Sequence, residues 1–102
     1  MAKQVIWSAR AQQDRKEILN YWIQRNRSNI YSKKLNTLFK NATKIISEFP
    51  KIGKLTDDKT LRIKIVRDYL MIYQETQTQI HILTIWDSRR DPDKLEKIVA
   101  GR

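Results

Sequence analysis

Three short apolar runs in the second half of the chain constrain the fold most, because they predict a small sheet of adjacent strands. The runs occupy residues 61–67, 69–73 and 80–86 and are rich in isoleucine, tyrosine and other residues that favour strands. Arg67 and Asp68 connect the first two runs, and residues 75–79 form the turn before the third, so neighbouring strands are expected to pair as hairpins. The third run is apolar on both faces, which is typical of a central strand.

Alternate side chains of the run 61–67 are apolar and cationic, which places the two kinds on opposite faces of a strand. The apolar ones belong to Leu61, Ile63 and Ile65, and the cationic ones to Arg62 and Lys64. We expect the cations to stand on an exposed face of the sheet, where they can meet a phosphate backbone or an acidic peptide.

A stripe of apolar side chains predicts a long amphipathic helix that ends before Pro50. The stripe is widened by Phe39 and Ile46, and its members are Tyr31, Leu35, Leu38, Ala42, Ile45 and Phe49. An earlier helix is predicted to begin at Ala9, with Ser8 as its N-cap. A polar turn at residues 28–29 separates the two helices. We expect an antiparallel helical hairpin with the stripe buried on the sheet. A coiled-coil dimer is the less favoured alternative, since the stripe lasts under three heptads.

The whole chain, residues 1–102, is predicted to form a single α+β domain with the element order β-α-α-β-β-β-α. A first strand is expected at residues 4–7, a polar loop at 51–59 and a final short helix at 93–99. The two-helix hairpin would pack on a small, mainly antiparallel sheet, covering one face and leaving the other partly open.

The net charge of +10 is concentrated in the helical half of the chain. Residues 1–56 contain twelve Lys and Arg against three Asp and Glu, whereas residues 57–102 contain nine against eight. Such an excess favours nucleic acid, the ribosome or an acidic partner segment, although a solvated lysine-rich surface has the same composition. No apolar run approaches the roughly 18 residues of a membrane span, and no secretory signal is recognisable, so we expect a cytoplasmic protein.

Several kinds of catalysis are excluded by residues that the chain lacks. With no cysteine and a single histidine, His81, it has no nucleophilic triad and no metal-ligand spacing, and it has no glycine-rich phosphate loop. We interpret His81, which lies between isoleucines in a predicted strand, as structural. We expect neither a cofactor nor a metal nor a small-molecule substrate. Any enzyme built from this sequence would use arginine, lysine and tyrosine, a set suited to phosphodiester chemistry.

The ordered combination of these segments resembles the RelE/ParE superfamily of toxins from type II toxin–antitoxin modules. The resemblance rests on residues 8–14 at the first helix, the Phe-Pro-Lys-Ile-Gly sequence at 49–53, the Tyr-x-x-x-Tyr strand at 69–73, and the strand 80–86 that runs into Arg89 and Arg90. It implies a toxin that arrests growth and a cognate acidic antitoxin as partner.

The superfamily implies two alternative activities for the basic residues. RelE-like members cleave mRNA on the ribosome; under that pattern Arg62, Lys64 and Arg89 would be catalytic. ParE-like members inhibit DNA gyrase without cleaving RNA, and under that pattern the same cations would only bind the target. Further residues are predicted to bind the substrate or target under either pattern: Arg67, Tyr69, Tyr73, Asp87 and Arg90.

Two departures from the ribonuclease pattern slightly favour the gyrase alternative. Leu70 stands where that pattern has an arginine after the first strand tyrosine, and Leu95 lies where it has a C-terminal tyrosine. A basic nucleic-acid-binding module without toxicity remains a third hypothesis, because the cationic helical half could contact phosphates by itself.

Overall fold

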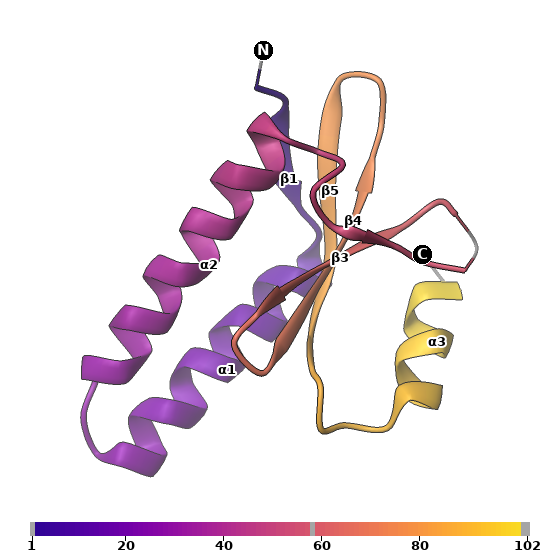
Figure 1. Cartoon of the computed structure of the whole chain (residues 1–102). Helices are drawn as coiled ribbons and strands as arrows, with labels where there is room; N and C mark the ends of the chain where they lie inside the picture. The colour runs from indigo at the N-terminus through magenta and orange to yellow at the C-terminus, as the bar shows by residue number, and fades with distance from the viewer. Residues whose placement is uncertain (1, 58, 101–102) are drawn as a thin grey trace.

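The computed structural model describes residues 2–57 and 59–100 (Figure 1). Within those residues three helices and five strands follow one another along the chain. Their bounds are β1 Gln4–Trp7, α1 Ala9–Asn26, α2 Ile30–Glu48, β2 Lys54–Leu55, β3 Arg62–Val66, β4 Tyr69–Glu75, β5 Gln79–Asp87 and α3 Pro92–Ala100. The predicted α+β class and element order are confirmed, with one addition, since the loop expected at 51–59 contains the two-residue strand β2.

The sheet has the strand order β1-β5-β4-β3-β2. The β2–β3, β3–β4 and β4–β5 pairs are antiparallel, as hairpin connections require, and β1 joins β5 in parallel. The α1–α2 hairpin carries the chain from β1, at one edge of the sheet, to β2 at the other. The hairpin lies on one side of the strands, and α3 lies across from it (Figure 1).

Helix α1 begins where the sequence predicts, because Ser8 caps it. The Ser8 hydroxyl accepts a hydrogen bond from the Ala11 amide at 2.9 Å and donates one to the Leu83 carbonyl at 2.8 Å, tying the helix start to β5. The helix ends at Arg27, whose positive φ of 50° gives a left-handed C-cap.

The buried stripe of α2 is rotated from the predicted one. Its buried positions are Ser32, Leu35, Phe39, Ala42 and Ile46. Ile45 and Phe49, which were predicted to be buried, are 38% and 62% exposed. The large Phe39 and Ile46 side chains lie at the centre of the stripe rather than at its margin. Ser32 is tolerated there because its hydroxyl donates to the Leu19 carbonyl of α1 at 2.9 Å.

The expected exposure of the two faces of β3 is wrong. Arg62 and Lys64 pair across the strand with Tyr73 and Met71, two residues of the core under the hairpin. Because directly opposed residues share a face, the cations lie on the hairpin side of the sheet. The apolar residues face the other way; Leu61 is buried there, whereas Ile65 is 67% exposed.

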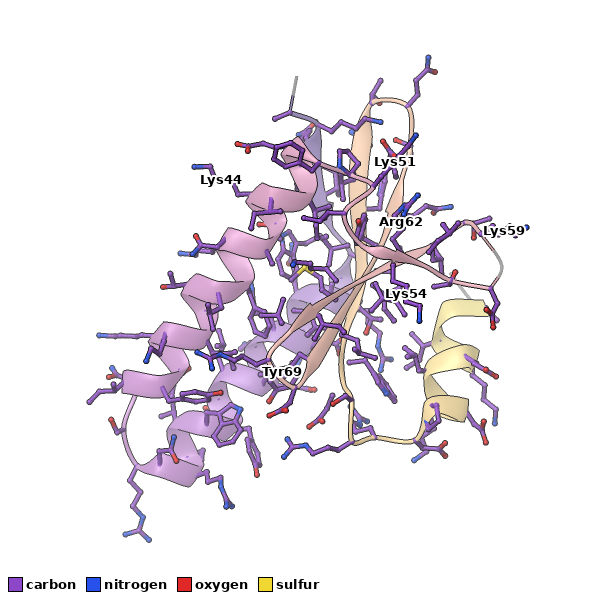
Figure 2. The ribbon with its side chains drawn as sticks, viewed as in Figure 1. Lys44, Lys51, Lys54, Lys59, Arg62 and Tyr69 are labelled. Carbon is purple, nitrogen blue, oxygen red and sulfur yellow. The ribbon has the colours of Figure 1, made fainter. Side chains whose placement is uncertain are left out.

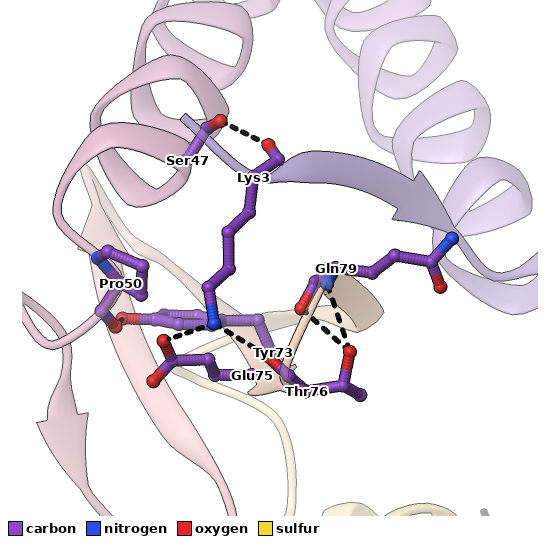
Figure 3. A network of polar contacts seen from close by, with 7 residues as sticks. All are labelled: Lys3, Ser47, Pro50, Tyr73, Glu75, Thr76 and Gln79. Atoms are coloured by element: carbon purple, nitrogen blue, oxygen red, sulfur yellow. Dashed lines mark hydrogen bonds and ion pairs between the residues drawn. The ribbon is translucent and has the colours of Figure 1, made fainter. Parts of the chain in front are cut away.

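The N-terminal segment is fastened to two distant parts of the fold (Figure 3). The Lys3 backbone and Ser47 of α2 exchange hydrogen bonds, since the Lys3 amide donates to the Ser47 carbonyl and the Ser47 hydroxyl donates to the Lys3 carbonyl. The Lys3 ammonium pairs with the Glu75 carboxylate at 2.8 Å and donates to the Thr76 carbonyl at 2.6 Å. These contacts hold β1 at the sheet edge.

In the described part of the chain no helix is long and apolar enough to cross a membrane, and no cluster of acidic or histidine side chains is arranged to hold a metal ion.

Candidate functional site

A pocket of about 380 Å³ lies between α1 and the C-terminal end of β5. It brings together four of the predicted site residues, Tyr69, Asp87, Arg89 and Arg90. Helix α1 completes the wall with Asp14, Glu17, Ile18 and Tyr21, and β5 adds Ile85. The pocket therefore combines two guanidinium groups, three carboxylates and two phenols.

Arg89 is held by Asp87 through three hydrogen bonds. Its Nε donates to Asp87 Oδ1 at 3.0 Å, one of its terminal nitrogens donates to Oδ2 at 2.8 Å, and its amide donates to Oδ1 at 2.9 Å. This pairing lowers the pKa of the Asp87 carboxyl and raises the pKa of the Arg89 guanidinium. With its side chain 60% exposed, Arg89 faces solvent while sharing its charge with the carboxylate.

Arg90 takes a different position, over the indole of Trp86. Its guanidinium carbon lies 4.4 Å from the ring centroid, within the range of a cation–π contact. Trp86 is only 2% exposed, and its Nε1 has no hydrogen-bond partner among the described residues. Arg90 thus covers a buried aromatic side chain while remaining exposed itself.

The Tyr69 side chain lines the buried part of the pocket. It is 3% exposed, and its hydroxyl accepts a hydrogen bond from Trp22 Nε1 at 2.8 Å. Burial raises the pKa of the Tyr69 phenol above its ordinary value. Its part in the fold is to join α1 to the start of β4.

Arg62 and Tyr73 lie elsewhere, under the loop that follows α2. The Tyr73 hydroxyl donates to the Pro50 carbonyl at 2.6 Å and accepts from the Gly53 amide at 2.9 Å. Arg62 donates through one terminal nitrogen to the Gly53 carbonyl at 2.8 Å and to the Lys51 carbonyl at 3.2 Å. Burial raises the pKa of the Tyr73 phenol. These two residues brace the loop.

Lys64 and Arg67 line a third place, a groove of about 250 Å³ between α2 and β3. Arg67 occupies the β3–β4 turn with a φ of 58°, a left-handed conformation that non-glycine residues seldom adopt. The predicted basic constellation is therefore divided between the pocket, the braced loop and this groove. Strand alternation and order along the chain give no distance between segments and so could not reveal the division.

The predicted site residues do not include Asp14, a carboxylate on the inner face of α1 that is 9% exposed. Asp14 Oδ2 accepts hydrogen bonds from the Thr84 hydroxyl at 2.5 Å and the Ile85 amide at 3.1 Å. Its place between Ala11 and Ile18 on one helix face was an available signal, because an acid within an apolar stripe needs a partner.

Comparisons with known proteins agree with this fold. Residues 5–92 match the sequence model of the family described as "ParE toxin of type II toxin-antitoxin system, parDE". A solved structure, titled "Chromosomal ParDE TA system from P. aeruginosa", superposes with a TM-score of 0.72 at 13% identity, covering 84% of this chain and 96% of that one. Among curated proteins, none matches in sequence. Because the family match spans well over half of the residues, the chain belongs to the ParE toxin family of type II toxin–antitoxin systems.

Proposed function

We propose that this toxin arrests growth by inhibiting DNA gyrase and does not cleave RNA. The observation that carries the proposal is the position of Arg62, whose guanidinium donates to two carbonyls of the loop after α2. An arginine engaged in this way holds the protein's own backbone. Bringing it to a phosphate would leave those carbonyls without their charged donor.

The positions of the other two cations of the ribonuclease pattern support the same conclusion. Lys64 lies on the hairpin side of the sheet with Met71 as its cross-strand partner, and not on the exposed face where we expected the cations to meet a phosphate backbone. Arg89 is paired with Asp87, which offsets the positive charge that a phosphorane would require. Leu70 adds no cation beside them.

The pocket beside α1 keeps RNA cleavage as the second candidate. Arg89 and Arg90 are both exposed there, with the phenols of Tyr21 and Tyr69 in the same pocket. Separation of Arg89 from Asp87 by an incoming phosphate would create a cationic site next to an aromatic ring. This alternative predicts that Arg89 is indispensable.

One preparation of the purified toxin tests both candidates. Inhibition of gyrase supercoiling of relaxed plasmid, with mRNA left intact on programmed ribosomes, would support the proposal. Cleavage in the ribosomal A site that disappears in Arg89→Ala would overturn it. Lack of both activities would also refute it, since the toxin would then act on another target.

Two variants test whether Arg62 supports the fold or takes part in catalysis. Arg62→Ala is expected to lower the free energy of unfolding by about 1–3 kcal/mol while leaving the inhibition by each folded molecule unchanged. Lys64→Ala is the matched control, because its ammonium has no hydrogen-bond or ion-pair partner in the described structure and its loss should alter stability by less than about 0.5 kcal/mol.

Membership of the parDE family implies an antitoxin as partner. We propose that this antitoxin is acidic, because a net charge of +10 steers a negatively charged chain to the toxin. Association should then slow as salt rises, and an association rate that is independent of salt would contradict the proposal. Both partners would act in the cytoplasm, where gyrase meets DNA.

A further inference from the structure

The segment at residues 49–55, which we call loop 49–55, runs from the C-cap of α2 through β2 and presents apolar side chains to solvent. Phe49, Ile52 and Leu55 are 62%, 50% and 42% exposed. Isolated exposed apolar residues are common, but three large ones within seven residues of one loop form the kind of local surface that binds a partner. An aromatic member strengthens this interpretation, because aromatic side chains are enriched in protein interfaces.

The loop backbone is held by hydrogen bonds even though the apolar side chains face outward. The Ile52 amide donates to the Phe49 carbonyl at 3.0 Å, which closes a turn. Beneath the turn, Tyr73 and Arg62 bind the carbonyls and the amide described above. A loop braced in this manner loses little conformational entropy when it docks, so its exposed side chains are already positioned for a partner.

Cations flank the apolar side chains. Lys51 and Lys54 alternate with Ile52 and Leu55 along the loop, and residues 49–55 include no acidic residue. Both lysines are exposed. Figure 2 shows that they lie around the loop on the same side of the molecule as Lys59 and Arg62. The surface therefore offers positive charge beside apolar area.

The loop also contains an edge strand of the sheet. Strand β2 is the last in the order β1-β5-β4-β3-β2, and it pairs with β3 through the contacts Lys54 to Ile63 and Leu55 to Arg62. An edge strand of this kind can accept an extended segment by backbone hydrogen bonding, with alternate side chains placed toward and away from the loop.

We propose that loop 49–55 is a docking surface for an acidic protein segment that carries apolar side chains. Carboxylates of the segment pair with Lys51 and Lys54, and its apolar side chains cover Phe49 and Ile52. Nucleic acid fits less well, because phosphates would use the lysines and leave the aliphatic side chains exposed. The proposal is independent of whether the toxin acts on gyrase.

A fluorescent peptide of about ten residues, alternating glutamate and leucine, tests the surface because period-two alternation gives it one acidic and one apolar face. Binding to the intact toxin is measured by anisotropy and mapped by amide NMR shifts. We expect shifts centred on residues 49–55 and binding that weakens as salt rises from about 50 to 300 mM. Shifts centred elsewhere, or binding that does not depend on salt, would overturn the proposal.

Two double variants and their matched controls define the contribution of each kind of side chain. Lys51→Glu with Lys54→Glu, and separately Phe49→Ser with Ile52→Ser, should each weaken binding by at least about tenfold. The charge control is Lys33→Glu with Lys34→Glu, about 25 Å away at the other end of α2 by helical rise. The apolar control is Ile23→Ser with Ile30→Ser, a pair 38% and 76% exposed. Both controls should bind the peptide with less than about threefold change.

All the substituted side chains are exposed, so thermal unfolding should confirm that each variant is folded. Equal binding by the loop variants and by the wild-type chain would overturn the proposal. It would also fail if a peptide with lysine in place of glutamate, or a single-stranded oligonucleotide, bound loop 49–55 more tightly than the acidic peptide.

Discussion

Replacement of Gly53 by alanine is the sharpest test of how the loop after α2 is held. A Cβ atom at this position would lie 2.6 Å from the Tyr73 hydroxyl oxygen, 2.8 Å from Cε1 and 3.0 Å from Cζ. The glycine does not have a positive φ, so its backbone conformation alone would not penalise alanine. The close approach of the phenol is therefore the reason that glycine is required.

Three contributions set the size of the effect. Tyr73 is fully buried and bonded on both sides of its hydroxyl, so overpacking should cost about 1–3 kcal/mol. Weakening of the two hydrogen bonds adds about 0.5–1.5 kcal/mol each. Reduced entropy of the unfolded chain offsets about 0.4–1 kcal/mol. We expect Gly53→Ala to lower the free energy of unfolding by about 2–4 kcal/mol, a large fraction of the stability of a small domain.

Urea unfolding of four proteins measures the effect: the wild type, Gly53→Ala, Tyr73→Phe and the double variant. Tyr73→Phe removes the atom nearest the new Cβ but leaves Cε1 at 2.8 Å, so the alanine should cost about 0.5–1 kcal/mol less in that background. If Gly53→Ala were as stable as the wild type, or if the two substitutions were additive, the close contact with Tyr73 would not be what selects glycine.

Further predictions concern Asp14 and the perturbed ionisable groups. Asp14→Ala should lower the free energy of unfolding by about 1.5–3 kcal/mol, because it removes the carboxylate that accepts two buried hydrogen bonds. Chemical denaturation measures this change, and Glu17→Ala, at an exposed position, is the control that should change the free energy by less than about 0.5 kcal/mol. Burial raises the pKa of Tyr73, so the stability that its protonated phenol contributes should be fully present below the ordinary pKa of about 10. This contribution should be lost as pH rises through the higher folded pKa. An equal loss of stability in Tyr73→Phe over the same pH range would refute this prediction. Arg89 lowers the pKa of Asp87, so Arg89→Ala should raise that pKa toward the ordinary value of about 3.9. NMR titration of the Asp87 carboxyl measures the change, and an unchanged pKa would show that the ion pair is absent in solution. In the wild type, the stability linked to Asp87 should be present above that value and be lost as pH falls through the lower folded pKa.

Local patterns in the sequence were sufficient for the elements and their order. Ser8 predicted the start of α1, Pro50 predicted the end of α2, and the three apolar runs became β3, β4 and β5. These features depend on interactions between residues close in the chain, such as capping, the conformational restriction before proline and side-chain alternation. The resemblance to the RelE/ParE superfamily rested on the same ordered segments and is confirmed by the family match.

The tertiary structure alone decided which faces are buried and which predicted site residues come together. Alternation places Arg62 and Lys64 on one face of β3, but only the docking of the hairpin determines that this face is the covered one. Rotation of α2 about its axis likewise depends on how Phe39 and Ile46 fill the space above the sheet. The pocket, the braced loop and the groove divide the basic residues because each is formed by segments far apart in the chain. Those positions are set by packing between elements, which has no counterpart in the spacing of residues along a single one.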